Sequence, residues 1–108
     1  MFGLVVRFNL KEGSGERFDA LTREVVAAIR EAEPGTLIYA CHAVEGDADA
    51  RIFYELYRDR AAFEDHERAE HVNRFHQEKE KYLAGEPRVE FLNFHVGKGV
   101  PEPQAQRP

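Results

Sequence analysis

Apolar and polar side chains alternate along the start of the chain. One face of residues 2–10 carries only apolar side chains, those of Phe2, Leu4, Val6, Phe8 and Leu10. Successive side chains of an extended chain point to opposite sides, so this period of two predicts a strand with one buried face. Lys11-Glu12-Gly13 then predicts a turn, and Ser14 is expected to cap the helix that follows.

The spacing of apolar residues next changes to three and four, which is typical of one buried stripe on a helix. That stripe consists of Phe18, Leu21, Val25, Ala28, Ile29 and Ala32. The sequence Glu33-Pro34-Gly35 is expected to end the helix, because proline disfavours helical backbone at the preceding residue.

The remainder of the chain predicts two more strands, a long helix and a last strand. Residues 36–44 and 51–58 read as strands joined by a loop over 45–50. A helix over 60–84 follows, capped by Asp59 and interrupted near Ala69-Glu70, and residues 88–96 form the fourth strand. Residues 97–108 contain three prolines without apolar periodicity, and we expect a flexible tail there.

The order β-α-β-β-α-β predicts an α+β, ferredoxin-like domain over residues 1–96, with two helices on one face of a four-stranded antiparallel sheet. The last two strands carry bulky apolar side chains on both faces. Such strands are normally buried on both sides, and two helices cover only one. We therefore expect a homodimer that packs sheet against sheet.

Composition narrows the possible partners. The 108-residue chain has a net charge of −5 with mixed signs throughout, which gives nucleic acid no basic stripe to bind. No apolar run approaches the ~20 residues of a membrane span. The single Cys41 has no internal disulfide partner, and no signal peptide opens the chain, so a cytoplasmic setting is expected.

The segment 53–66 brings together groups that can do chemistry. Glu55 and Tyr57 share one face of a predicted strand, and His66 lies on the first turns of the next helix. A neutral imidazole can act as a general base near pH 7, whereas a buried histidine bonded to Glu55 or to a backbone carbonyl would serve packing alone. Glu55 would either orient His66 or pair with an arginine, namely Arg7, Arg58 or Arg88. Tyr57 would donate to an oxyanion or simply pack.

Other histidines lie further along the helix. On a continuous helix His71 would lie about 140° around the axis from His66, so a joint site requires a break between them. His76 falls within the apolar stripe of the second predicted helix, near Val72, Lys79 and Leu83, and is interpreted as a core or rim residue. The five histidines contain no HExxH pattern, and no glycine-rich phosphate loop opens a helix, so neither a metal nor a nucleotide cofactor is expected.

The chain resembles the antibiotic-biosynthesis monooxygenase family in its element order, in the turn Glu33-Pro34-Gly35, and in the segment 54–59 that leads to Phe63 and His66. The resemblance implies a dimeric α+β barrel. His66 matches the helix histidine of the quinol-monooxygenase-like and signal-isomerase branches. Glu55, Tyr57 and His71 match positions of the isomerase branch.

The heme-degrading branch fits less well. His76 resembles the position of its heme ligand. However, that branch also uses an asparagine in the first strand and a tryptophan at the end of the third. Val6 and Tyr57 stand at the corresponding positions here, and the chain contains no tryptophan.

By resemblance, the expected function is cofactor-independent oxidation of a small aromatic, quinol-type or polyketide-like substrate by dioxygen. His66 would remove a proton, Glu55 would support it, and Tyr57 or Asn9 would stabilise the oxyanion. The residues expected to bind the substrate are Phe8, Phe53, Phe63, His71, His76 and Phe94. Two alternatives remain open: an isomerase of a small (phospho)sugar-like signal, and a non-catalytic dimer that binds a ligand.

Overall fold

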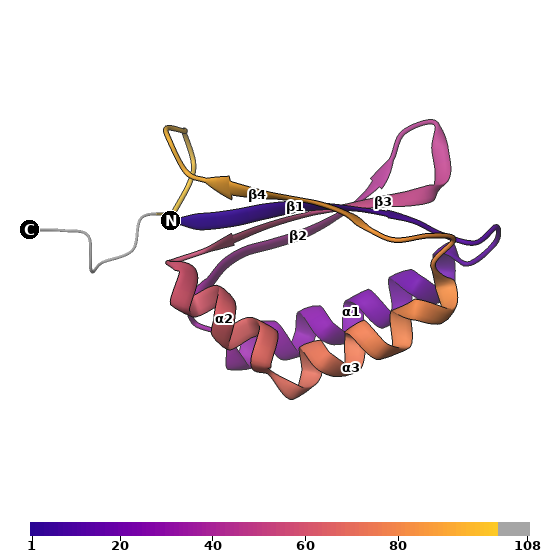
Figure 1. Ribbon diagram of the computed structural model, residues 1–108, viewed down its shortest axis with the longest axis horizontal. Coiled ribbons are helices and arrows are strands. Elements are labelled where there is room, and N and C mark those ends of the chain that lie inside the picture. Colours follow the sequence, from indigo (N-terminus) through magenta and orange to yellow (C-terminus); the bar gives the residue numbers. More distant parts are fainter. Residues whose placement is uncertain (102–108) are drawn as a thin grey trace, which may run out of the picture.

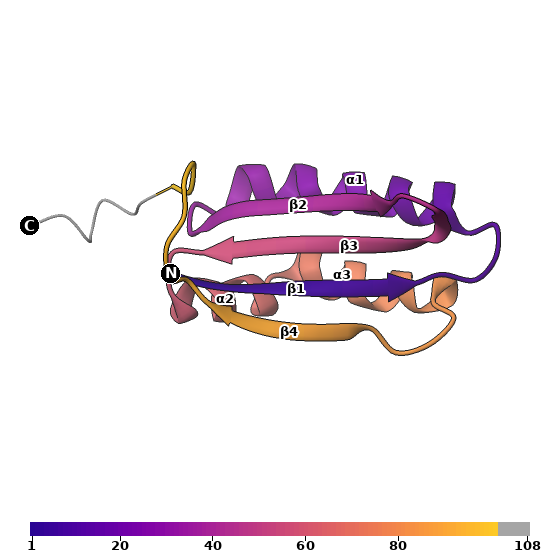
Figure 2. The same cartoon turned by 90° about the horizontal axis from the view of Figure 1, so that it is seen from above.

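The computed structural model describes residues 1–101 and contains one sheet with helices on one of its faces (Figure 1). Its elements in chain order are β1 (Phe2–Asn9), α1 (Gly15–Ala32), β2 (Thr36–Val44), β3 (Asp47–Tyr57), α2 (Arg60–Arg68), α3 (Glu70–Lys79), the 3₁₀ turn η1 (Glu80–Tyr82) and β4 (Arg88–Asn93). The strand order is β2-β3-β1-β4 and all neighbours are antiparallel (Figure 2). The predicted ferredoxin-like α+β fold is confirmed.

The alternating face of β1 forms the centre of the core, as its pattern predicts. Phe2, Leu4, Val6 and Phe8 are all buried on the side of the helices. Phe8 packs against Phe18 of α1, with 5.4 Å between ring centroids. Of the predicted stripe of α1, Phe18, Val25 and Ile29 are buried, together with Thr22. Leu21 and Ala28 are partly buried, and Ala32 is exposed. Ser14 precedes α1 without a side-chain capping bond, contrary to expectation.

The hairpin between β2 and β3 is tighter than the sequence indicates. The predicted loop over 45–50 is wrong, because β3 begins at Asp47 and only two residues connect the strands. Gly46 has a φ of 83°, a backbone conformation that glycine adopts without strain. Polar residues such as Asp47 and Asp49 lie at the exposed end of the hairpin, which hid the strand from a search for apolar alternation.

The long second helix is interrupted at Ala69, as predicted. Asp59 caps α2 by accepting a hydrogen bond from the Ala62 amide at 2.8 Å. Ala69 then has an extended backbone, with φ −68° and ψ 139°. It ends α2 and also begins α3, since its carbonyl accepts from the amides of Val72 and Asn73. Regular helix ends at Lys79 rather than at residue 84.

The last strand, β4, lies at one edge of the sheet beside β1 (Figure 2). It ends at Asn93, three residues earlier than predicted. Large apolar side chains remain exposed on and after it, namely Val89, Phe91, Leu92, Phe94 and Val96. Residues 102–108 of the expected tail lie outside the described residues. Within residues 1–101, no helix is long and apolar enough to cross a membrane.

Candidate functional site

A cavity of about 160 Å³ lies between the helix-facing side of the sheet and the helices α2 and α3. We call it the chamber. Its apolar wall consists of Leu4, Val6, Phe8, Tyr39, Phe63, Phe75, Pro87, Val89 and Phe91. Its titratable residues are Glu55, His66, Glu67, His76 and Lys79. The chamber therefore combines aromatic surface with several groups that can exchange protons.

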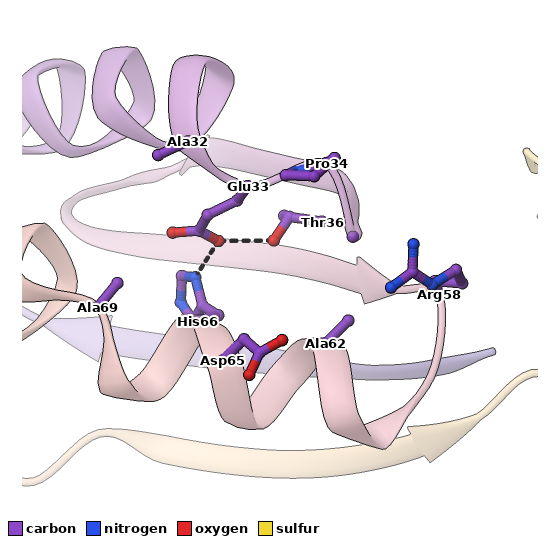
Figure 3. Close-up of a pocket in the computed structure, with 10 residues that line it drawn as sticks. Ala32, Glu33, Pro34, Thr36, Arg58, Ala62, Asp65, His66 and Ala69 are labelled. Carbon is purple, nitrogen blue, oxygen red and sulfur yellow. Dashed lines mark hydrogen bonds and ion pairs between the residues drawn. The ribbon is translucent and has the colours of Figure 1, made fainter.

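His66 is held on α2 with only 2% of its surface exposed. Its ring packs between two tyrosines, with centroid distances of 5.2 Å to Tyr57 and 5.5 Å to Tyr39. The imidazole also lines a second cavity of about 160 Å³, formed by the turn after α1 together with α2 (Figure 3). One ring thus separates two hollow regions.

The two ring nitrogens of His66 face different partners. Nδ1 lies 2.7 Å from Oε1 of Glu33, whereas Nε2 lies 3.9 Å from Oε2 of Glu67, a residue of the chamber wall. Because an ionised carboxylate only accepts, Nδ1 carries the proton and donates to Glu33. The Nε2 lone pair is consequently left on the side of the chamber.

Glu33 is the anchor of this arrangement. Its Oε1 accepts hydrogen bonds from Thr36 at 2.6 Å and from His66, and its Oε2 accepts from His71. Burial acts to raise the pKa of Glu33, but the bonds from Thr36, His66 and His71 outweigh it and lower that pKa. Glu33 is therefore an ionised carboxylate near neutral pH, held by three donors.

His71 and His66 both donate hydrogen bonds to the carboxylate of Glu33. The extended backbone at Ala69 turns α3 away from the axis of α2, so the two histidines can approach Glu33 from consecutive helices. The requirement for a break between them is met. His71 does not line the chamber, however, and its expected contact with substrate has no support in the geometry.

The turn that carries Glu33 packs unusually close to α2. A Cβ atom on Gly35 would lie 2.7 Å from the Cβ of Ala62, far inside an ordinary contact. Glycine at position 35 and a small residue at position 62 allow the turn to approach α2. This approach brings Glu33 within hydrogen-bond distance of His66.

Glu55 has a different partner from either of those predicted. Its Oε1 accepts a hydrogen bond from the Tyr57 hydroxyl at 2.6 Å, and no bond joins it to His66 or to an arginine among the described residues. Burial raises the pKa of Glu55 to about 7, although the bond from Tyr57 acts to lower it. Glu55 is thus a buried acid near half-protonation at neutral pH.

A second group of charged residues lies at the α3 side of the chamber. Lys79 Nζ donates to Nδ1 of His76 at 2.6 Å, and His76 Nε2 donates to Glu67 at 3.4 Å. Burial lowers the pKa of Lys79. The hydrogen bond from His76 lowers the pKa of Glu67. His76 is therefore bound to protein groups through both nitrogens, which argues against a free heme ligand.

The remaining expected site residues divide into three groups. Phe8, Phe63 and His76 line the chamber together with Glu55 and His66. Phe53 and Tyr57 are buried behind its wall, where the Tyr57 hydroxyl is occupied by Glu55. Asn9 and Phe94 lie elsewhere: Asn9 is exposed and accepts from Arg7, and Phe94 follows the end of β4. An oxyanion role for Asn9 has no support in this geometry.

Sequence reasoning missed four residues that shape the site, namely Glu33, Tyr39, Glu67 and Lys79. Glu33 was interpreted only as part of a helix stop, and Lys79 only as a member of the apolar stripe. One signal was available for Lys79, since a lysine at a buried helical position is unusual and invites a functional explanation. Within residues 1–101, no three histidine, cysteine, aspartate or glutamate side chains are grouped to hold a metal ion.

Comparison with known families gave one match along the sequence. The sequence profile described as antibiotic biosynthesis monooxygenase matches residues 1–78. That range contains the chamber residues of β1, β3 and α2, together with Glu33 and His71, whereas Lys79 and the chamber residues of β4 lie beyond it. Among curated proteins, none matched the chain in sequence.

Solved structures share the fold. A candidate antibiotic biosynthesis monooxygenase of Caulobacter crescentus CB15 is 20% identical, with a TM-score of 0.84 over 88% of this chain and 90% of that one. The protein PA3566 of Pseudomonas aeruginosa is 29% identical, with a TM-score of 0.78 over 88% and 94%. Rv0793 of Mycobacterium tuberculosis is 20% identical, with a TM-score of 0.80 over 92% and 98%.

Proposed function

Because the chain belongs to the antibiotic biosynthesis monooxygenase family, we propose that it oxidises a small aromatic, quinol-type substrate with dioxygen. One observation carries this proposal: the unprotonated Nε2 of a buried histidine faces an aromatic-lined chamber, while its Nδ1 is anchored to a carboxylate. That arrangement suits removal of a phenolic proton inside an apolar space.

Proton removal is the first step, and His66 performs it. Burial lowers the pKa of His66, although the bond to Glu33 acts to raise it, so the imidazole is neutral and able to accept a proton near pH 7. As Nε2 takes the phenolic proton, Glu33 stabilises the imidazolium that forms. Glu33 itself stays ionised, as an orienting carboxylate does in other acid–base pairs.

Electrons then pass from substrate to dioxygen. The phenolate of a quinol is electron-rich and reduces dioxygen, after which one oxygen atom adds to the ring and the other leaves as water. The substrate supplies all four electrons that reduce dioxygen, because the quinol is oxidised to a hydroxylated quinone. The aromatic wall, which includes Phe8 and Phe63, limits the access of water to the reactive intermediates.

The test is oxygen uptake with hydroquinones in an oxygen electrode, accompanied by anaerobic controls and by product mass. We expect uptake that requires the enzyme, incorporation of one atom from ¹⁸O₂, and a fall of about 10²–10⁴-fold in His66→Ala. Melting temperatures of the variant and the wild type establish that both are folded. Turnover that continues without oxygen contradicts the proposal and favours the isomerase alternative. An unchanged rate in His66→Ala removes the role of the histidine.

A further inference from the structure

Lys79 is a buried cation in the chamber wall that the proposed reaction does not use. It lies at the end of α3 with 7% of its surface exposed. A lysine side chain is long enough to place its ammonium in water while its stem stays buried. Here the ammonium instead lies within 5.5 Å of the ring centroids of Phe8 and Phe75, two residues of the chamber wall.

The ammonium group of Lys79 has more hydrogen-bond donors than it uses. Of its three protons, one is taken by Nδ1 of His76. Among residues 1–101, no other nitrogen or oxygen atom accepts from Nζ, and no carboxylate oxygen lies within 4.0 Å of it. The aromatic faces attract the charge without accepting a conventional hydrogen bond. Keeping a cation away from water in this way is costly unless a counter-charge joins it.

The carboxyl groups of the chamber are already bound to other residues. Glu67 accepts from Nε2 of His76. Glu55 accepts from the hydroxyl of Tyr57, and burial raises its pKa to about 7, so that it is only partly ionised near neutral pH. Lys79 is thus a cation of the chamber with donors left for a further acceptor.

The size of the chamber limits the ligand. Its volume is about 160 Å³, close to the ~150 Å³ of an engineered apolar cavity that admits benzene. Sites for drug-sized ligands span ~300–1,000 Å³. One aromatic ring therefore fits within this volume.

We propose that the chamber binds a single-ring aromatic acid, with the ring between the aromatic side chains and the carboxylate paired with Lys79. The proposal deepens the proposed oxidation by naming a substrate class, and it rests on that function only for the phenolic group. Lys79 would hold one end of the ring, so that the phenolic hydroxyl at the other end is presented to His66.

The experiment measures binding without turnover. 4-Hydroxybenzoate and 4-hydroxybenzamide have nearly the same shape and differ in charge. Their dissociation constants are measured by NMR titration or calorimetry at low salt for the wild type, Lys79→Met and Lys81→Met. Lys81 is an exposed lysine two residues away that pairs with Glu78, so its substitution removes the same charge outside the chamber. 6-Hydroxy-2-naphthoate tests the limit to one ring.

We expect the wild type to bind the carboxylate at least tenfold more tightly than the amide. Lys79→Met should reduce that ratio to near one, Lys81→Met should keep it, and the naphthoate should bind at least tenfold more weakly than the benzoate. A wild type without preference for the carboxylate overturns the proposal, and this measurement needs no variant. A preserved ratio in Lys79→Met also overturns it. If Lys79→Met fails to fold, Lys79→Gln replaces it.

This test separates the two proposals. Carboxylate-selective binding without oxygen uptake from 2,5-dihydroxybenzoate would overturn the oxidation alone. Oxygen uptake from neutral hydroquinones, with no selectivity for the acid, would overturn the role of Lys79 alone.

Discussion

Glu33 is the residue on which the chemistry of His66 depends. It accepts from Nδ1 of His66 and from His71, and so determines which nitrogen of His66 is basic. The local sequence does not indicate this role, because Glu33 and His66 come together only when the turn after α1 packs on α2. Sequence reasoning could identify His66 as a candidate, but its partner is a tertiary feature.

Glu33→Gln should lower the pKa of His66, since it removes a negative charge that favours the imidazolium. The acidic limb of the kcat/KM profile should move to lower pH, and kcat should fall roughly tenfold, as part of the ~10²–10⁴ that a general base contributes. The pH profile and the ¹⁵N shifts of His66 report both effects. Glu31→Gln, on the exposed side of α1, is the matched control. If the acidic limb of the pH profile does not move in Glu33→Gln, the proposed role of Glu33 is contradicted.

Glu55 should make the protein less stable as pH rises. Its pKa is about 7 in the folded state against 4.5 for the free group. Between these values the unfolded chain has released the proton and the folded chain retains it, so the free energy of unfolding falls by on the order of 1 kcal/mol per pH unit. The contribution is complete below about 4.5 and lost above about 7.

Glu55→Gln removes this titration while keeping an acceptor for Tyr57. Urea unfolding at several pH values between 5 and 8 should show the variant gaining stability relative to the wild type as pH rises. Glu12→Gln, at an exposed position in the turn before α1, should change nothing. A constant difference between wild type and Glu55→Gln would show that this carboxyl ionises normally.

At the scale of elements, hydrophobic periodicity identified every strand and helix but misplaced several ends. The stripe of α1 and the alternation of β1 are strong patterns because one face of each is buried in the core. The start of β3 is polar and exposed, so no apolar pattern marks that boundary. Beyond the end of α3, buried Leu83 continues the apolar spacing although the regular helix has ended. The break at Ala69 was visible only as an interruption of the apolar stripe of the second predicted helix.

Gly35→Ala tests the packing of the turn on α2. The added Cβ would meet Ala62 at 2.7 Å, so we expect a loss of about 1–3 kcal/mol in the free energy of unfolding. The separation of Glu33 from His66 should also reduce activity. Ala62→Gly in the same chain should restore part of both losses.

Gly85→Ala is the control, since a Cβ there meets nothing within 4 Å. Chemical denaturation and kinetics of the wild type, Gly35→Ala, Ala62→Gly and the double variant form a double-mutant cycle. Additive effects of the substitutions at positions 35 and 62 would contradict a direct contact between them.

At the scale of the whole molecule, large apolar side chains are exposed on the face of the sheet that the helices leave uncovered, and just after β4. Leu92 and Phe94 are each 37% exposed and Val96 is 79% exposed. The register of β1 and β4 pairs Leu92 with Gly3, opposite to the buried face of β1. A second copy that packs against this face would remove these side chains from water, and we propose a homodimer of this kind.

Sedimentation at micromolar concentration should then give the mass of a dimer. Leu92→Glu should shift the population to monomer, because it places a charge within the proposed interface. Val89→Glu introduces the same charge on the chamber side of β4 and should leave the mass unchanged. A wild-type monomer at this concentration would contradict the proposal.

The position of His66 between two cavities has a consequence for how protons travel. An imidazole that accepts on one edge and releases from the other can relay a proton through the partition it forms. In the proposed reaction, the ring that takes up the phenolic proton beside the substrate also borders the opposite compartment, where ionised Glu33 balances its charge. The reacting compound can stay enclosed while its charge balance is restored from outside.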